Sequence, residues 1–258
     1  MPNTALITGA SSGIGREFAR LHASKGGDVV ITARREEGLA ALKTELETQH
    51  QVAVTLVPLD LGAKGGAAKL YDTVNKIGIQ VDVLINNAGF GGHGKFIERK
   101  LEDDQAMIDL NVDVLVALCH MFGRDMVARG GGKILNVSST AAHMPGPLQA
   151  TYFATKAFVS SFSQALAEEM KDDRVTVTAL EPGYVETGFA DTADLGGTGL
   201  VDQKGKSATE TAKIGYDAML EGKLTVINEG RLSFMLNWVL PLFPQKAKLL
   251  MIRKMQEK

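Results

Sequence analysis

The 258-residue chain has one cysteine, Cys119, so it can form neither an internal disulfide nor a cysteine-based metal site. Its five histidines lack the spacing of a ligand set, and we expect no bound metal. A formal net charge of −2 gives no electrostatic reason to expect binding to nucleic acid or to an anionic membrane. No secretory signal precedes the first predicted strand, so the default expectation is a cytoplasmic location.

The remaining composition is that of an ordinary globular protein, with 45% hydrophobic and 22% charged residues. The length is sufficient for a substantial core, and α/β chains of this size often form one domain. We therefore predict a single domain over residues 1–258.

A tyrosine and a lysine lie four residues apart in a segment with a helical pattern, TYFATKAFVSSFSQALAEEM. This spacing places Tyr152 and Lys156 on one helical face. A free tyrosine has a pKa of about 10, and a nearby ammonium group lowers it. A decrease of about three units corresponds to about 4 kcal/mol, so Lys156 needs the help of another positive charge, such as an oxidised nicotinamide.

Ser139 lies thirteen residues before Tyr152, at the end of a predicted buried strand, KILNVSS. Its hydroxyl can point towards a ligand at that edge. The serine, tyrosine and lysine together suggest a site that moves a proton to or from a substrate oxygen while a cofactor moves a hydride. A Tyr-x-x-x-Lys pair by itself is more often a surface pair, so this interpretation depends on the rest of the chain.

A glycine-rich turn follows the first predicted strand, Thr4–Thr8, and precedes a helical pattern, REFARLHASKG. In such a turn Gly9 permits the tight bend, and Gly13 lets the backbone approach a pyrophosphate. Gly15 lets the helix pack closely, and the helix N-terminus favours an anion. The predicted cofactor contacts here are Gly9, Ser11, Ser12, Gly13, Ile14 and Gly15.

Two arginines, Arg34 and Arg35, follow the second predicted strand, Asp28–Ala33. An NAD-preferring site places a carboxylate near this position, whereas arginine can grip a 2′-phosphate. We therefore predict NADP(H) as the cofactor, with Arg34 as the better candidate because it is nearer the strand end. The alternative is that both arginines belong to a solvated helix start, neutralised by Glu36 and Glu37.

The third predicted strand, Gln51–Leu59, ends at Asp60 and Leu61, and a predicted helix (67–76) follows. Ligands of doubly wound sheets bind at the carboxyl ends of the strands. We predict that Asp60 and Leu61 contact the cofactor, with Asp60 accepting a hydrogen bond from the adenine amino group. The alternative role for Asp60 is to cap the helix.

The fourth predicted strand, Val81–Ile85, is followed by NNAG (86–89). Asparagine amides can tie neighbouring strand ends together through backbone groups. Ala88 and Gly89 leave room for a flat group over the sheet edge, and we predict cofactor contacts for Asn87, Ala88 and Gly89.

Two polar side chains near this edge have competing interpretations. Asn111 lies in the predicted helix Leu101–Met126, where an amide is costly unless it is hydrogen-bonded. It can bond local backbone, position a water near Lys156, or do both. His93, in a glycine-rich loop, is more plausibly a solvated residue than a catalytic one.

The sixth predicted strand, Arg174–Leu180, follows the fifth and ends in a rigid turn that contains Pro182 and Gly183. Val185 and Thr187 come next and are placed to touch the carboxamide end of a nicotinamide. These four residues complete the predicted cofactor site.

The predicted substrate loop or lid covers residues 184–220. Its stretch 191–206 is polar and rich in glycine, as binding loops and disordered segments are. Ser207 is predicted to cap a helix that continues to Leu220, and residues 224–228 form the seventh predicted strand.

The C-terminal extension, residues 230–258, contains a strongly apolar stretch, Leu232–Phe243, that is too short to span a bilayer. We favour a core or subunit-interface helix here, ahead of a cover over a hydrophobic substrate pocket. Shallow membrane contact by the basic end is the third and least favoured interpretation.

Together these motifs resemble the short-chain dehydrogenase/reductase family: TGASSGIG at 8–15, DL at 60–61, NNAG at 86–89, Asn111, Ser139, YFATK at 152–156 and PG at 182–183. The resemblance implies one Rossmann-like, doubly wound α/β domain with a seven-stranded parallel sheet flanked by helices. It also implies a catalytic group of Asn111, Ser139, Tyr152 and Lys156, with the last two also contacting the cofactor, and a homodimer or homotetramer. The tail is not a shared motif of the family.

The predicted activity is NADP(H)-dependent interconversion of a ketone or aldehyde and an alcohol, in the reductive direction, on a hydrophobic carbonyl substrate. Tyr152 is the general acid/base. The alternative from another class is a catalytically silent dinucleotide-binding sensor or scaffold. A membrane-associated lipid ketone reductase would keep the chemistry and change the location.

Overall fold

The centre of the computed structural model, which describes residues 3–199, 201 and 205–258, is a seven-stranded parallel sheet. Its order is β3-β2-β1-β4-β5-β6-β9, and every neighbouring pair is parallel. The predicted seven-stranded parallel sheet is confirmed. Its strands are β1 (Thr4–Thr8), β2 (Asp28–Ala33), β3 (Val54–Pro58), β4 (Val83–Asn86), β5 (Gly132–Val137), β6 (Val175–Leu180) and β9 (Thr225–Val226).

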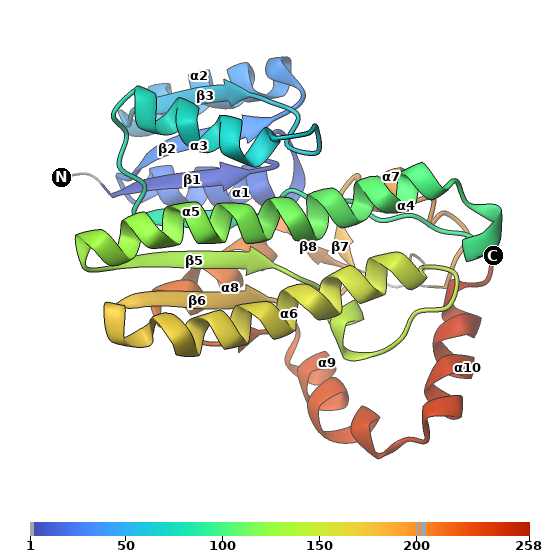
Figure 1. The fold of residues 1–258 in the computed structure, drawn as a ribbon. Helices are drawn as coiled ribbons and strands as arrows, with labels where there is room; N and C mark the ends of the chain where they lie inside the picture. Colours follow the sequence, from blue (N-terminus) through green and yellow to red (C-terminus); the bar gives the residue numbers. More distant parts are fainter. Residues whose placement is uncertain (1–2, 200, 202–204) are drawn as a thin grey trace.

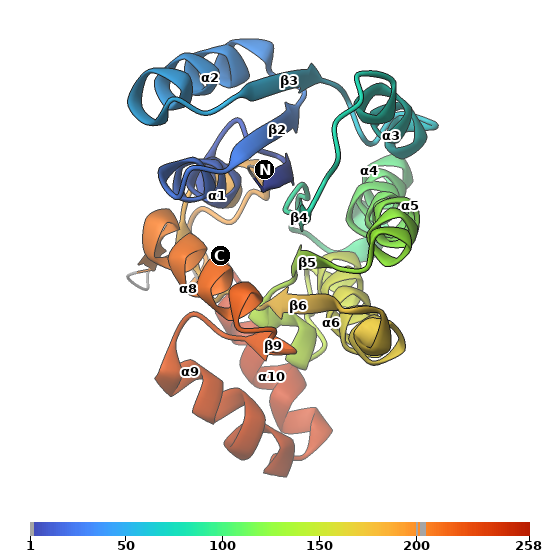
Figure 2. The same ribbon diagram turned by 90° about the vertical axis from the view of Figure 1, so that its left-hand side faces the viewer.

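Helices cover both faces of the sheet (Figures 1 and 2). One face carries α1 (Gly13–Ser24), α2 (Glu36–His50) and α8 (Ala208–Leu220), and the other carries α3 (Gly66–Lys76), α4 (Leu101–Ile108), α5 (Val114–Arg129) and α6 (Ala150–Met170). Side chains of a strand alternate between the two faces, so Ile7 packs into one core and Leu6 into the other. Because both faces are buried, the strands read as continuous apolar runs.

The order of the strands determines where the predicted cofactor site lies. From β1 the chain winds outwards to β2 and β3, then returns to β4 on the other side of β1. Loops diverge where the order reverses, and parallel strands present their carboxyl ends at one edge. The predicted motifs after β1, β2, β4, β5 and β6 therefore meet along that edge.

The predicted bounds of β1 and β2 agree with the structure, whereas several strand ends differ. The third strand covers only Val54–Pro58, and the seventh is reduced to Thr225–Val226. Pro58 cannot donate to a neighbour, and it lies on the edge strand, where no donation is required.

The predicted helix Leu101–Met126 is interrupted by a π-turn, Asp109–Asp113, between α4 and α5. By length and composition, the continuous stretch Leu101–Arg129 is the one described helix that could cross a membrane. Its inner side chains, including Phe122 and Met126, pack into the core, as expected for a core helix of the sheet layer.

The last part of the chain adds smaller elements beyond the sheet. They are β7 (Val185–Glu186), which pairs with β8 (Lys206–Ser207), α7 (Phe189–Thr192), α9 (Gly230–Phe234), a π-turn (Met235–Val239), a 3-10 turn (Leu240–Leu242) and α10 (Gln245–Gln256). Further 3-10 turns cover Phe96–Glu98, Thr140–His143 and Lys171–Asp173. The segment from α9 to α10 projects from one side and returns to the carboxyl edge of the sheet (Figure 1).

Candidate active site

Two adjacent serines follow β5, and their hydroxyls have different partners. Ser138 Oγ donates to the backbone oxygen of Lys156 at 2.8 Å and lies 2.8 Å from Ser160 Oγ, so it anchors α6. Ser139 Oγ accepts from the backbone N–H of Ala141 at 3.1 Å and donates to the Pro182 carbonyl at 3.4 Å, and its proximity opposes the rise in the pKa of Tyr152. Ser139 is therefore the serine that faces the tyrosine.

Tyr152 and Lys156 lie one turn apart near the start of α6, as their spacing predicts. The lysine Nζ is 5.8 Å from the centre of the tyrosine ring and donates to the backbone oxygen of Val137 at 2.9 Å. Both side chains are buried, with exposed fractions of 9% and 6%. The end of β5 thus holds the ammonium group beside the phenol.

Burial controls the ionisation of both groups. It raises the pKa of Tyr152 to about 12, against the opposing effect of Ser139. It lowers the pKa of Lys156 to about 8. Among the protein's own groups the pKa of Tyr152 is raised and not lowered, because desolvation of the phenolate outweighs the effect of Ser139. Tyr152 is therefore a protonated phenol at neutral pH. The expected decrease requires Lys156 together with a second positive charge, such as an oxidised nicotinamide, and stays a prediction.

Asn111 lies in the π-turn Asp109–Asp113 and is buried. Its Oδ1 accepts from the N–H of Phe90 at 3.1 Å, and its Nδ2 donates to the Phe90 carbonyl at 2.9 Å and to Thr155 Oγ1 at 3.1 Å. The interpretation that Asn111 bonds local backbone is wrong, because its partners lie on the loop after β4 and on α6. π-Turns often occur at functional sites.

The loop after β4 passes directly over the site. A Cβ on Gly89 would lie 2.8 Å from Asn111 Oδ1 and 3.6 Å from Lys156 Nζ. A Cβ on Gly91 would lie 3.3 Å from the ring of Tyr152. Only glycine lets the backbone approach these groups so closely.

The glycine-rich turn packs against the end of β4, as the sequence predicts. Asn87 Nδ2 donates to the carbonyl of Thr8 at 2.9 Å, and Thr8 Oγ1 accepts from the N–H groups of Asn87 and Ala88, both at 2.9 Å. A Cβ on Gly9 or Gly15 would lie 2.8 or 2.4 Å from Asn87 Nδ2. These glycines therefore form a cradle that any side chain would fill, at the N-terminus of α1, which fits a dinucleotide phosphate.

The turn after β6 reaches the same cradle. A Cβ on Gly13 would lie 3.3 Å from Thr187 Cγ2, so two predicted cofactor contacts from distant parts of the chain are neighbours. Gly183 donates its N–H to Asn228 Oδ1 at 3.0 Å, which fixes the turn. Two more predicted contacts lie in this stretch, Pro182 and Val185.

Both arginines after β2 are exposed. Arg35 Nη2 donates to Ser12 Oγ, at the start of α1, at 3.1 Å. The sequence favours Arg34, whereas the structure joins Arg35 to the cradle. Of the other predicted contacts there, Ser11 is buried and Ile14 is half-buried.

Asp60 is exposed at the end of β3, and its Oδ1 accepts from the N–H of Gly62 at 3.1 Å. The N-cap of α3 is Gly65, so the alternative that Asp60 caps this helix is wrong. Leu61 is buried in the core, so its side chain has a packing role.

The C-terminal helix α10 covers the catalytic tyrosine candidate. Ile252 is buried in one cluster with Met107 and Tyr152, against which Phe189 and Met255 also pack. Residues from α4, α6, α7 and α10 thus form one apolar enclosure.

Polar contacts hold the end of the chain over this enclosure. Gln256 Oε1 accepts from Gln149 Nε2 at 2.5 Å, and its carbonyl lies 2.6 Å from His93 Nε2. Lys258 Nζ lies 2.8 Å from a carboxylate oxygen of Asp194. The interpretation of His93 as a solvated loop residue is wrong, because its ring is half-buried and bonded to the C-terminal segment.

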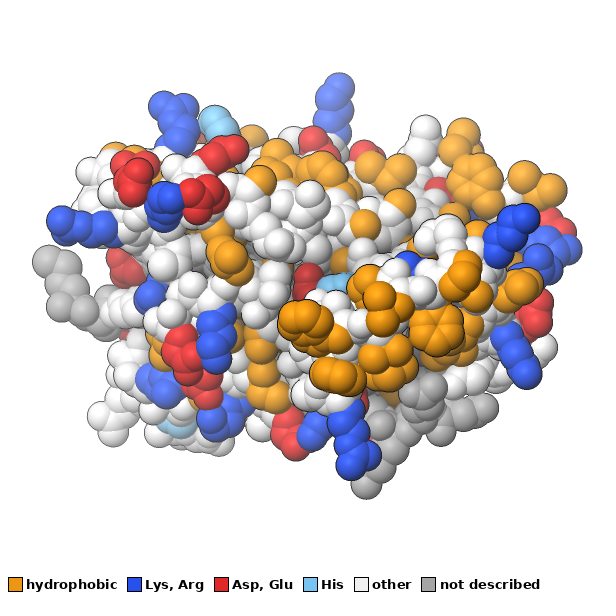
Figure 3. Space-filling view, turned by 90° about the horizontal axis from the view of Figure 1, so that it is seen from below, with side chains coloured by type: hydrophobic (Ala, Val, Ile, Leu, Met, Phe, Trp, Pro, Cys, Tyr) orange, Lys and Arg blue, Asp and Glu red, His pale blue; other side chains and the backbone are white. Residues whose placement is uncertain are grey.

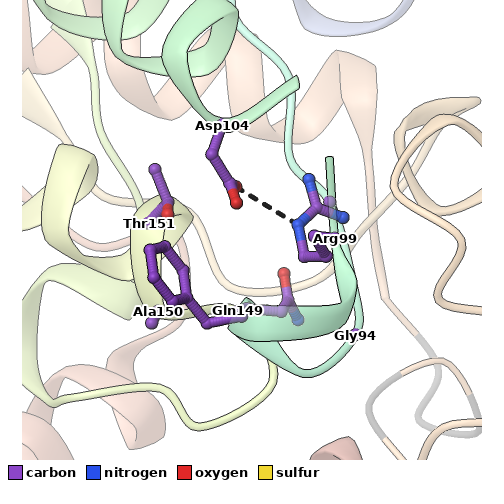
Figure 4. Close-up of a pocket in the computed structure, with 8 residues that line it drawn as sticks. Gly94, Arg99, Asp104, Gln149, Ala150 and Thr151 are labelled. Carbon is purple, nitrogen blue, oxygen red and sulfur yellow. Dashed lines mark hydrogen bonds and ion pairs between the residues drawn. The ribbon is translucent and has the colours of Figure 1, made fainter. Parts of the chain in front are cut away.

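The loop that carries His93 is held by Arg99, whose Nε donates to Asp104 Oδ1 at 3.2 Å (Figure 4). Arg99 Nη1 also donates to the His93 carbonyl at 3.1 Å. The cavity beside this ion pair measures about 10 Å³, which is room for about one water. It is therefore no ligand site. Its lining residues are Gly92, Gly94, Phe96, Arg99, Asp104, Gln149, Ala150 and Thr151.

Sequence reasoning missed the residues that enclose the tyrosine, above all Phe189, Ile252 and Gln256. The available signal was the spacing of Ile252 and Gln256, which places both on one helical face. Thr155, the partner of Asn111 on α6, was also missed, and a single buried threonine carries no pattern that would reveal it.

The fold and site define a dinucleotide-binding α/β protein with a serine, tyrosine and lysine at the carboxyl edge of its sheet. The model of the short chain dehydrogenase family matches residues 3–195, and the chain belongs to this family.

Three similar proteins illustrate the family. A very-long-chain 3-oxoacyl-CoA reductase of Laccaria bicolor is 36% identical over 186 residues, which cover 70% of this chain and only 54% of that protein. Dehydrogenase/reductase SDR family member 7B of Rattus norvegicus is 32% identical over 93% of this chain and 77% of its own length. A short-chain dehydrogenase from Sphingobium yanoikuyae, solved in complex with NADPH, is 29% identical with a TM-score of 0.84, covering 91% of this chain and 90% of that one.

Proposed function

We propose that the protein is an NADP(H)-dependent oxidoreductase that reduces a hydrophobic ketone or aldehyde to an alcohol. The observation that carries the proposal is the meeting of Ser139, Tyr152 and Lys156 at the edge that also holds the glycine cradle. Binding alone does not require these three groups together, whereas proton transfer does. The catalytically silent sensor or scaffold is therefore the weaker reading.

The residues have separate tasks in this mechanism. Bound NADPH supplies the hydride. Tyr152 donates its phenolic proton to the carbonyl oxygen, and Ser139 holds that oxygen as negative charge develops. The Lys156 ammonium stabilises the phenolate left behind and would help to hold the ribose of the bound nicotinamide. Asn111 fixes the loop over the site and supports a water that restores the proton.

The proposed cofactor contacts follow the cradle. The backbone of the glycine-rich turn binds the pyrophosphate at the N-terminus of α1. Arg35 and Arg34 bind the 2′-phosphate, where a guanidinium gives two hydrogen bonds and a charge. The NADPH complex of the similar Sphingobium protein supports the choice of nucleotide.

The reductive direction and the substrate class rest on the surroundings of Tyr152. A tyrosine is already protonated at neutral pH, and burial raises the pKa of Tyr152 further, to about 12, which disfavours the phenolate that alcohol oxidation would need. The enclosure formed by Met107, Phe189, Ile252 and their neighbours is apolar. These apolar surroundings of Tyr152 favour a hydrophobic carbonyl compound as the substrate, and the similar Laccaria protein is named for a very-long-chain substrate. The cytoplasmic location and the homodimer or homotetramer stay predictions.

The decisive variant is Tyr152→Phe, which removes one hydroxyl and keeps the ring. We expect NADPH-dependent reduction of a panel of hydrophobic ketones to fall at least about 100-fold, the usual contribution of a general acid, with NADPH affinity in calorimetry unchanged. The matched control is Tyr71→Phe, which removes a hydroxyl bonded to Asp125 outside the site. Equal turnover of the Tyr152→Phe variant and the wild type would remove the assignment. NADPH binding without consumption across the whole panel would favour the silent binder.

A further inference from the structure

The segment from residue 231 to 254, which we name the tail hairpin, exposes an unusual amount of apolar surface. Fifteen large apolar side chains are exposed among the described residues, and seven of them lie within it. They are Phe234, Met235, Trp238, Leu242, Phe243, Leu250 and Met251. Hydrophobic side chains gather on the face from which the hairpin projects, with Lys and Arg at the margins (Figure 3).

The tail hairpin has two faces. Leu236, Leu240 and Ile252 are buried, the last of them in the cluster around Tyr152, whereas Trp238 is 71% exposed and Leu242 82%. The interpretation as a core helix therefore holds only for the inner face. An exposed apolar group of this size, on a segment attached by its other face, marks a surface that meets a partner.

The charge of this region differs from that of the whole chain. Residues 230–258 hold six basic and one acidic side chain, a net charge of +5, while the chain as a whole carries −2. On the outer face of α10, Lys246, Leu250 and Lys254 follow one another at four-residue spacing. Both lysines lack a carboxylate partner among the described residues. A partner that fits this surface therefore has an apolar region bordered by negative charge.

We propose that the tail hairpin docks onto the surface of an anionic lipid bilayer. Trp238, Leu242 and Phe243 enter the boundary between headgroups and acyl chains, where the indole ring is favoured. Lys246 and Lys254 lay their aliphatic stems along the apolar surface and hold their ammonium groups among the lipid phosphates.

A bilayer fits these observations better than a second copy of the chain. In a two-fold symmetric contact the same patch faces itself, so each lysine would approach the equivalent basic region of its partner. Anionic headgroups supply the opposite charge instead. The inner face of α10 meanwhile covers Tyr152, so the docking surface and the enclosure share one helix. The docking itself does not depend on the proposed activity.

The chain contains its own reporter for this proposal, because Trp238 is its only tryptophan. We expect its emission to shift to shorter wavelength when the full-length protein is mixed with vesicles of phosphatidylcholine and phosphatidylglycerol in equal amounts. Pure phosphatidylcholine should produce a much weaker shift, and added salt should reverse the binding to the anionic vesicles. Co-sedimentation with the same vesicles provides the partition coefficient.

Two variants test the two parts of the surface and keep Trp238. Leu242→Asp should weaken partitioning at least about tenfold, because it removes a leucine-sized apolar group. Lys246→Gln with Lys254→Gln should weaken it about thirtyfold on anionic vesicles, from about 1 kcal/mol per lysine. The control Ile77→Asp changes a half-exposed apolar residue at the end of α3, on the opposite side of the sheet, and should bind as the wild type does. Circular dichroism melting checks that each variant folds.

Three results would overturn the proposal. One is equal partitioning of all variants. Another is equal partitioning of the wild type onto neutral and anionic vesicles. The third is an emission shift that follows protein concentration in the absence of vesicles, together with a larger species in sedimentation, since this would assign the surface to a second copy of the chain.

Discussion

At the scale of single residues, burial at the site disfavours the charged forms of both Lys156 and Tyr152. Burial lowers the pKa of Lys156 to about 8 and raises that of Tyr152 to about 12. Desolvation of this kind at a cleft is typical of catalytic groups, because a protein gains no stability from it. The free-energy cost of burying the charged lysine can be measured.

The first prediction concerns Lys156→Met. A lysine whose pKa is lower in the folded state binds fewer protons there than when unfolded, so its penalty is complete below about pH 8 and disappears as the pH rises towards about 10.5. The shift corresponds to about 3 kcal/mol, and the lost hydrogen bond to Val137 offsets about 1 kcal/mol. We expect the variant to be about 2 kcal/mol more stable in urea denaturation near pH 7, and inactive. A gain that is the same near pH 10.5 would contradict the burial argument.

The second prediction compares the two adjacent serines. Ser139→Ala should lower turnover about 100-fold, because it removes the hydroxyl that holds the reacting oxygen, and should cost about 0.5–2 kcal/mol of stability, because Ser139 Oγ caps the turn Thr140–His143. Ser138→Ala leaves the Lys156 carbonyl without its donor and costs about 1–3 kcal/mol of unfolding free energy. Turnover of the folded Ser138→Ala variant should stay within a few-fold of the wild type. Equal loss of turnover in both variants would mean that the geometry does not separate their roles.

The sequence could predict those parts of the site that depend on local spacing. Tyr152 and Lys156 lie one turn apart on any helix, and glycines after a strand predict a tight turn by themselves. The pKa of Tyr152 could not be predicted in this way. It depends on how completely α10 and α7 exclude water, and these helices lie far away in the sequence.

At the scale of elements, the π-turn Asp109–Asp113 shows why a long helical pattern was only partly correct. One extra residue in the turn presents Asn111 towards Phe90, and hydrophobic periodicity does not reveal such an insertion. The carboxyl ends of the strands were predicted more reliably than their full lengths. Glycine, proline and asparagine in the turns that follow the strands mark these ends in the sequence. The lengths of the outer strands β3 and β9 depend instead on how far each pairs with its single neighbour, which the sequence does not reveal.

The third prediction tests this turn with Asn111→Leu. The variant leaves the N–H and the C=O of the half-buried Phe90 without their partners, at about 1–3 kcal/mol each. We expect a loss of about 2–5 kcal/mol in urea denaturation and a lower turnover.

The chain offers a matched control for this prediction in its second π-turn, Met235–Val239. There Asn237 is exposed, and its partner among the described residues is Ser233. Asn237→Leu should change stability by no more than about 0.5 kcal/mol. Similar losses in both variants would show that the cost comes from the π-turn itself and not from the contact with Phe90.

At the scale of the whole molecule, α10 has two faces in different surroundings, one inside the protein and one at its surface. Its inner face closes the enclosure around Tyr152, and its outer face carries the lysines and apolar groups of the tail hairpin. The sequence favoured a core or interface helix because the stretch is apolar. Composition alone does not show which side of a helix is covered, since that depends on contacts with α4, α6 and α7.

The last prediction separates the two surfaces with neighbouring residues on α10. Ile252 is 5% exposed and Met251 is 45% exposed, so the same substitution reaches opposite faces. Ile252→Asp places a charge inside the enclosure, which should undock α10, admit water to Tyr152 and raise KM for a hydrophobic ketone at least about tenfold, from the loss of one buried aliphatic side chain. NADPH affinity should not change, because the glycine cradle lies elsewhere. Met251→Asp should leave KM in solution unchanged and weaken binding to anionic vesicles. If Met251→Asp instead raised KM as much as Ile252→Asp, the two faces of α10 would not act separately, and the substrate would have to enter along the exposed side of the tail hairpin.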